Sequence, residues 1–150
     1  MLFLVFISCS SGQNKGDETS GTNLNNTDTI AKGAIVYVEV NDPLEDRLIL
    51  EGKAIFDAQC SNCHYLDTAT LNGPGWAGIS NRRDPNWIMN MILNVDMMNE
   101  VDSVAHTLLK NSTMQMPDQG LSVDKARAIL EFMRKNDLDQ TSRKDEGVNN

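Results

Sequence analysis

The stretch Cys60-Ser61-Asn62-Cys63-His64 is the one around which this chain is organised. Two cysteines separated by two residues, with a histidine directly after the second, form the pattern of covalent c-type haem attachment. Each thiol can add to one vinyl group of the porphyrin, and the short spacing holds both sulfurs over one edge of the ring. His64 is then carried under the iron, where a neutral imidazole nitrogen can take the proximal axial position. The pentapeptide predicts one haem, bound through Cys60 and Cys63 and ligated by His64.

The same five residues have two other interpretations. A thioredoxin-like dithiol sits where a strand meets a helix, and the sequence predicts no sheet that would hold it. A zinc site needs four ligands, whereas the remaining cysteine and histidine are Cys9, near the N-terminus, and His106. Haem attachment is therefore favoured, and an oxidoreductase that uses the dithiol without haem is kept as a rival.

Length and charge narrow the class of protein. The 150 residues suffice for one ordinary domain, and only 5% of them are aromatic, so a buried haem would complete an otherwise modest core. The net charge of −8 argues against nucleic acid as a partner, because phosphate binding needs a clustered basic face. An acidic redox protein would suit a partner with a basic docking patch.

The N-terminal residues predict an exported chain. The apolar run 1–8 is followed by Cys9 and resembles the lipobox of bacterial lipoproteins, in which the cysteine is lipidated after cleavage of the signal. The run is too short to span a bilayer and lacks a basic start, so residues 1–9 are read as a truncated signal. An ordinary signal remnant with an incidental cysteine is the alternative. Residues 10–42 read as a flexible polar tether with one extended segment at 34–40, and a periplasmic location with a lipid anchor on Cys9 is expected.

Helical periodicity predicts an all-α domain of about four helices over residues 43–137. Asp42 with Pro43 predicts the start of a helix that runs to about Ala58, and Asp84 with Pro85 predicts the start of another. Further elements are an amphipathic helix with Val101, Val104, Ala105 and Leu108 on one face and a final helix capped by Ser122. Residues 65–83 and 111–120 read as loops, and 138–150 as a disordered polar tail.

The second axial ligand of the iron is sought among the eight methionines. Met91 and Met133 fall on apolar helix faces, where methionine is usually core filler. Met114 and Met116 lie in an irregular stretch with no helix face to pack on, so either thioether can point inward. Pro117 stiffens the loop directly after Met116.

Four features in order carry a family resemblance. They are Gly52-Lys53-Ala54-Ile55-Phe56 before the CxxCH pentapeptide, then Gly73-Pro74, then Met116-Pro117, then an amphipathic C-terminal helix. This order, over roughly residues 44–136, resembles class I mono-haem cytochromes c. The resemblance implies a cytochrome c fold in which the N- and C-terminal helices pack together, with Gly52 and Phe56 against Ile129 and Phe132.

The resemblance also implies roles at the haem. Met116 matches the distal ligand, with Met114 as the fallback, and the Pro74 carbonyl matches the acceptor of the proximal histidine's other nitrogen. Trp76, Arg82 and Arg83, together with Trp87, are candidates for packing on the haem or holding its propionates, although solvated arginines fit the sequence equally well. His106 is a minor alternative as a second histidine ligand.

An iron held by histidine and methionine is coordinatively saturated, which favours one-electron transfer over binding of oxygen or peroxide. The expected function is an electron carrier, not an enzyme, between a membrane quinol-oxidising complex and a terminal reductase or oxidase. A haem sensor or peroxidase-like enzyme with a labile Met116 is the rival. The segments 73–79, 82–89 and 128–133 are similar to small cytochromes associated with nitrous oxide reductase systems, which implies an anaerobic acceptor.

Overall fold

The computed structural model describes residues 34–149, so Cys9 and the tether expected at 10–33 lie outside the described residues. The described part is helical, and extended residues pair in it only at the isolated bridge between His64 and Thr70. Its α-helices are α1 (Asp46–Ile55), α2 (Ile79–Arg82), α3 (Pro85–Leu93), α4 (Val95–Val101), α5 (Ser103–Asn111) and α6 (Val123–Thr141). A π-helical turn, η1 (Phe56–Cys60), continues α1, and a 3-10 turn, η2 (Glu146–Asn149), follows α6. The predicted all-α class is confirmed.

None of the helices within residues 34–149 combines the length and the apolar character needed to span a bilayer.

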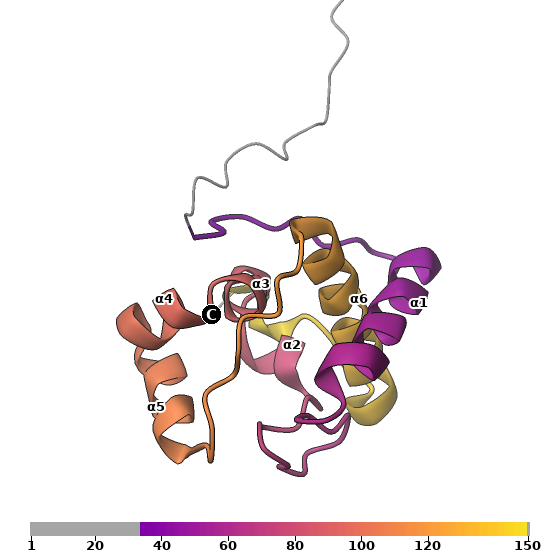
Figure 1. Cartoon of the computed structure of the whole chain (residues 1–150). Coiled ribbons are helices and arrows are strands. Elements are labelled where there is room, and N and C mark those ends of the chain that lie inside the picture. Colours follow the sequence, from indigo (N-terminus) through magenta and orange to yellow (C-terminus); the bar gives the residue numbers. More distant parts are fainter. Residues whose placement is uncertain (1–33, 150) are drawn as a thin grey trace, which may run out of the picture.

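Helices α1 and α6 cross in close contact, as the resemblance implied (Figure 1). A Cβ atom on Gly52 would lie 2.1 Å from the backbone oxygen of Ala128 and 2.8 Å from the Cβ of Phe132, so only glycine fits at this crossing. One turn further on, the rings of Phe56 and Phe132 have centroids 5.7 Å apart. Glycine at position 52 therefore allows the two helices to approach this closely.

Two predicted helix starts have different outcomes. Asp84 caps α3 as predicted, because its side chain accepts from the Asn86 N–H. The start at Asp42 is wrong: α1 begins at Asp46 and its N-cap position is Glu45, whose backbone is extended. The Glu45 N–H donates to Glu131 Oε1 at 2.9 Å, so a contact with α6 takes the place of a local cap.

The amphipathic helix expected to begin with Val101 is divided in two. Asp102 has an extended backbone between α4 and α5, and its side chain caps α5 by accepting from the Ala105 N–H at 2.8 Å. Val101 ends α4 and is 72% exposed, so it does not share the apolar face of Ala105 and Leu108. Apolar spacing alone did not reveal this break.

The extended segment at 34–40 lies against the domain, one of the two arrangements compatible with a single unpaired strand. Its backbone pairs with a side chain: the Ile35 N–H donates to Asn90 Oδ1 at 2.8 Å, and Asn90 Nδ2 donates to the Ile35 carbonyl at 2.9 Å. Ile35, Val38 and Val40 pack on the core. Val36 points to solvent, with 85% of its surface exposed.

The tail predicted to be disordered after residue 137 is ordered in the described residues. Helix α6 continues to Thr141, and Asp137, one turn before its end, is fully buried. The Asp137 carboxylate accepts from the backbone N–H groups of Gly78 and Ser80, both at 2.6 Å, and from the Ser80 hydroxyl at 2.7 Å. Asp137, which the sequence places beside a polar tail, thus joins the last turns of α6 to the start of α2.

A buried ionic network explains why the following residues are also held. Arg134 has no solvent exposure, and its guanidinium binds both carboxylate oxygens of Asp145 at 2.6 and 2.7 Å. It also donates to Glu131 at 2.8 Å and to the Asn41 carbonyl at 2.7 Å. Three segments far apart in the sequence, near residues 41–45, 131–134 and 145, meet at this network.

Candidate functional site

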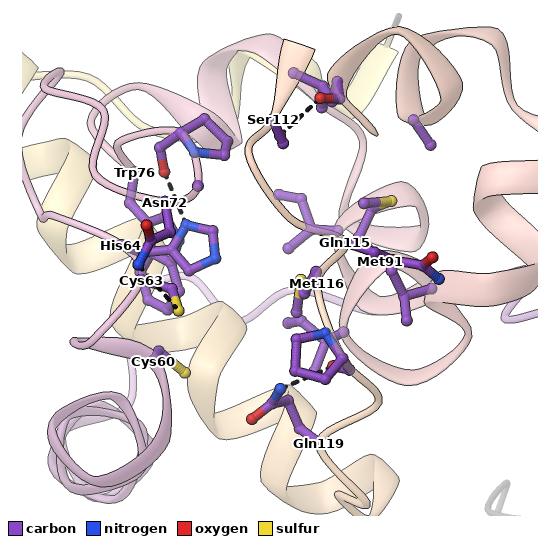
Figure 2. Close-up of a pocket in the computed structure, with 18 of the residues that line it drawn as sticks. Cys60, Cys63, His64, Asn72, Trp76, Met91, Ser112, Gln115, Met116 and Gln119 are labelled. Carbon is purple, nitrogen blue, oxygen red and sulfur yellow. Dashed lines mark hydrogen bonds between the residues drawn. The ribbon is translucent and has the colours of Figure 1, made fainter. Parts of the chain in front are cut away.

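One cavity of about 330 Å³ lies between α6, α3, α5 and the chain that follows η1. Most of its wall is apolar. The lining includes most of the residues that the sequence singled out: Cys60, Cys63, His64, Pro74, Trp76, Trp87, Met91, Met114, Met116 and Met133. The predicted haem-binding pentapeptide and the predicted distal loop therefore face the same space (Figure 2).

The two cysteines are positioned by the end of α1. The π turn closes through a hydrogen bond of 2.9 Å from the Ser61 N–H to the Phe56 carbonyl, and the N–H groups of Cys63 and His64 both donate to the Cys60 carbonyl. This tight turn brings both free thiols to the wall of the cavity. Burial raises the pKa of the Cys60 thiol to about 11, with Cys63 adding in the same direction, so Cys60 stays protonated at neutral pH.

His64 is oriented by a backbone carbonyl. Its Nδ1 lies 2.8 Å from the Pro74 oxygen, and because a carbonyl only accepts, Nδ1 carries the proton. The other ring nitrogen is then an unprotonated donor of a lone pair, and Figure 2 shows it facing the cavity. Burial lowers the pKa of His64, which the bond to Pro74 only partly opposes, so the ring is neutral at pH 7.

Glycine at position 73 leaves room for this imidazole. A Cβ atom on Gly73 would lie 2.4 Å from His64 Cε1, so a larger residue would displace the ring from Pro74. The Gly73-Pro74 pair thus provides both the space and the acceptor.

The stretch between α5 and α6 forms the opposite wall. It has no regular structure, as predicted, and it runs between the two halves of the domain (Figure 1). Met116 is partly buried and lies across the cavity from His64 (Figure 2). Met114 also lines the cavity, but 55% of its surface is exposed.

The loop that carries Met116 is held from outside by one side-chain contact. Gln115 Nε2 donates to Asp96 Oδ1 on α4 at 2.7 Å, while the other hydrogen bonds found within 112–121 join neighbouring residues. This contact joins positions 19 residues apart, and no sequence pattern predicts it.

Of the candidates for haem packing and propionate binding, the tryptophans line the cavity and the arginines do not. Trp76 is 6% exposed and lines the cavity, with its ring centroid 4.7 Å from that of Phe56 and 5.7 Å from that of His64. Arg82 and Arg83 do not line the cavity. Arg82 donates to the Ala77 carbonyl at 2.7 Å, and Arg83 lies 5.2 Å from the Trp87 ring.

The remaining sequence candidates are one histidine and two methionines. His106 is exposed, contacts the Asn99 carbonyl and does not line the cavity, so it does not face His64. Met91 and Met133, read as core filler, both belong to the cavity wall. Their helical spacing is the same for residues that pack in a filled core and for residues that line a cavity.

The shape and chemistry of the cavity fit a haem. Its wall is apolar, as a porphyrin face requires, with thiols and an imidazole on one side and a thioether on the other. Trp87 also lines the cavity. Its indole N–H is directed at the Asp102 carboxylate and helps to keep the pKa of that group below its usual value.

Comparison with known proteins agrees with this site. The family described as "Cytochrome c" matches residues 49–137. No curated protein matches the chain. The solved structure of cytochrome c from Rhodothermus marinus is similar, with 32% identity, a TM-score of 0.69, and coverage of 72% of this chain and 92% of that one. An engineered form, Rma TDE, has 31% identity and a TM-score of 0.67, with coverage of 70% and 90%.

A further structure of that engineered protein, bound to a carbene intermediate, has 31% identity and a TM-score of 0.64, with coverage of 70% and 90%. The family match spans more than half of the chain. The R. marinus cytochrome c supports it, since 92% of that protein's own length is matched. This chain therefore belongs to the cytochrome c family, as a class I mono-haem member that transfers electrons through one haem c attached to Cys60 and Cys63.

Proposed function

We propose that the chain is a one-electron carrier whose haem iron is held between His64 and Met116. The observation that carries the proposal is their placement on opposite sides of one apolar cavity, with His64 fixed by the 2.8 Å bond to Pro74. Haem, when bound there, supplies an iron that changes its charge by one. His64 and Met116 would supply both protein ligands of that iron, so that little rearrangement would accompany the change.

Each residue has a distinct part in this proposal. The Pro74 carbonyl keeps the proton on His64 Nδ1 and so leaves the other nitrogen free to bind iron. The Met116 thioether would supply the second protein ligand of the iron and would so exclude oxygen and peroxide. The apolar wall keeps water from the haem, and together with the methionine ligand this favours a raised reduction potential.

Donor and acceptor are proposed at the level of class. The carrier takes electrons from a membrane quinol-oxidising complex and delivers them to a terminal reductase or oxidase. Family membership suggests an exported, periplasmic protein. A lipid on Cys9 would hold it at the membrane, a proposal that an intact-mass measurement of the membrane-extracted protein tests.

The axial ligand is tested with haem-loaded protein. The wild-type ferric spectrum is expected to contain a methionine–iron charge-transfer band, and the ferrous form is expected not to bind carbon monoxide. Met116→Ala is expected to lose the band and to bind carbon monoxide, because the distal position opens. Met114→Ala is the matched control, since Met114 lines the same cavity, and both properties should persist in it.

Two results would contradict this assignment. Persistence of the band in Met116→Ala would move the ligand elsewhere, and its loss in Met114→Ala would assign it to Met114. Rapid binding of carbon monoxide by the wild-type ferrous protein would favour a sensor or a peroxidase-like enzyme.

A further inference from the structure

Trp87 on α3 lines the haem cavity and also meets two charged side chains that do not line it. The guanidinium carbon of Arg83 lies over the Trp87 ring, 5.2 Å from the ring centroid. The indole N–H of Trp87 is directed at the Asp102 carboxylate. One residue of the cavity wall therefore has a cation over its face and an anion at its N–H edge.

Asp102 is held as an anion at the break between α4 and α5. Its position lies between Asn99 of α4 and Ala105 of α5, which both line the cavity. Its Oδ1 accepts from the Ala105 N–H at 2.8 Å. Burial opposes ionisation of this carboxyl, but the N–H groups of Ala105 and Trp87 outweigh it and lower the pKa of Asp102. Asp102 is therefore charged at neutral pH.

Arg83 lies beside Trp87 without neutralising Asp102. The guanidinium donates to the Arg82 carbonyl at 3.0 Å. It influences Asp102 through its charge and not through a hydrogen bond. A cation over an indole face is also attracted by the ring. The two opposite charges thus meet different parts of one side chain, and each keeps a field of its own.

The surroundings of Asp102 let its charge act over a distance. Asp102 is half-buried, whereas acids such as Asp46 and Asp124 are exposed, where water and salt screen them. The nearby cavity wall includes Val95 and Leu108, which are apolar. A charge acts more strongly through such a medium of low dielectric constant than through water.

We propose that Asp102 and Arg83 set the reduction potential of the haem with opposite signs, as positioning residues that act across Trp87. The inference rests on the proposed carrier function. One electron arrives from the donor and later leaves to the acceptor, and no bond is made or broken. The Asp102 carboxylate favours the oxidised, more positive form and lowers the potential, whereas the Arg83 guanidinium favours the reduced form and raises it.

Asp102→Asn tests the anion. Asparagine caps a helix about as well as aspartate and can still accept from the indole, so the variant removes mainly the charge. Potentials of the haem-loaded proteins are measured by spectroelectrochemistry at pH 7 and low salt. The equilibrium constant for accepting one electron should rise about fivefold, or about 40 mV at 59 mV per tenfold.

Asp46→Asn is the matched control for this variant. It removes the same charge from an exposed position in the first turn of α1, away from the cavity lining, and should change the constant by less than about 1.5-fold. An unchanged or lowered constant in Asp102→Asn, or equal changes in the two variants, would overturn the proposal.

Arg83→Gln tests the cation and should have the opposite sign. The constant should fall about threefold, and the double variant with Asp102→Asn should return close to the wild-type value. Arg47→Gln, at an exposed arginine of α1, should leave the constant unchanged. Loss of packing alone would move Asp102→Asn and Arg83→Gln in the same direction, and that result would overturn the proposal.

The part assigned to Trp87 has a separate readout in the NMR spectrum of the reduced protein. The chain contains two tryptophans, so two indole N–H signals are expected. The signal of Trp87 should move in Asp102→Asn, whereas that of Trp76 should stay in place. An unmoved Trp87 signal, or equal shifts of both signals, would contradict a direct contact between the indole and Asp102.

The proposed carrier function fails in a different way. Absence of a reversible one-electron response in the wild-type protein would contradict the carrier function and this inference together. A reversible wild-type response with equal potentials in Asp102→Asn and Asp46→Asn would leave the carrier function standing and overturn only the role of Asp102 and Arg83.

Discussion

Two faces of α6 are both buried but are held in opposite ways. The face that carries Ile129 and Met133 borders the haem cavity and consists of apolar side chains. The face that carries Glu131 and Arg134 is equally buried and consists of ions that satisfy one another. One helix thus separates a space that needs a cofactor from a network that is complete without one.

The two faces separate the residues that stabilise this small domain from those that hold the haem. The ionic side joins the segment before α1, the middle of α6 and Asp145 through direct hydrogen bonds. The cavity side has Met116 on a loop that one outside hydrogen bond restrains. Changes on the ionic side should therefore alter stability with little effect on the haem spectrum, and changes on the cavity side should do the reverse.

Arg134→Ala should have the largest effect. It removes the cation that Glu131 and Asp145 share, and although each keeps one other cationic partner, breaking such a buried pair typically costs about 3–5 kcal/mol. Chemical unfolding of the haem-loaded protein measures the loss, while the methionine–iron band should stay in place. Arg47→Ala, which removes two exposed ion pairs, should cost no more than about 1 kcal/mol. Similar losses in the two variants would show that burial of the network does not matter.

Gly52→Ala should have the next largest effect. Its added methyl group would lie 2.1 Å from the Ala128 oxygen, which is backbone and cannot rotate away. The helices α1 and α6 must separate, and overpacking of this kind typically costs about 1–3 kcal/mol. The midpoint of thermal unfolding should fall, and an unchanged midpoint would mean that the crossing can widen freely.

Acid should weaken the ionic side through Asp145. Burial opposes ionisation of this carboxyl, but the hydrogen bonds from Arg134 and Lys144 outweigh it and hold its pKa below 3.8. A lowered pKa in the folded state gives stability that is complete above about pH 4 and is lost as the pH falls through the folded value. The unfolding free energies of wild type and Asp145→Asn, measured from pH 7 to pH 3, should therefore converge at acid pH. Parallel curves would contradict the pairing.

The smallest expected effect is on the cavity side. Asp96→Ala removes the acceptor of Gln115, and an exposed hydrogen bond to a charged group is worth about 1 kcal/mol. The ferric protein should bind added imidazole about fivefold faster, because the Met116 loop opens more often. Glu100→Ala removes an exposed acidic residue from the same helix and should not change this rate. Equal rates in the two variants would mean that Asp96 does not restrain the loop.

The cavity could be predicted from sequence because its parts are local signals. Cys60, Cys63 and His64 occupy five consecutive positions, and the Pro74 acceptor and Met116 are each marked by a short motif. The structure brings all of them to the lining of one cavity. Met133 belongs to the buried core, as its helical spacing predicts, but the spacing does not indicate that Met133 and Met91 also line the cavity, because a helical stripe looks the same beside a filled core and beside a cofactor.

The ionic side could not be predicted, because its meaning lies in pairs that are distant in sequence. Glu131 and Arg134 look like charges on a solvated helix face, and Asp145 looks like part of a frayed tail. Their burial depends on contacts such as that between Glu45 and Glu131, separated by 86 positions. The break at Asp102 was missed for a similar reason, since a capping aspartate within an apolar pattern does not interrupt the period.

The bonds between Ile35 and Asn90 determine where any preceding segment joins the domain. The attachment point is α3, which also carries Trp87 and Met91 of the haem cavity, rather than the start of α1. The length of any tether that precedes residue 34 would therefore be counted from this point. Attachment at α3 would restrict how the domain can turn relative to the anchor. If the chain is held at a membrane, the orientation of the haem cavity toward that membrane is restricted by the bonds of Ile35 to Asn90 and by the packing of Val38 and Val40 on the core.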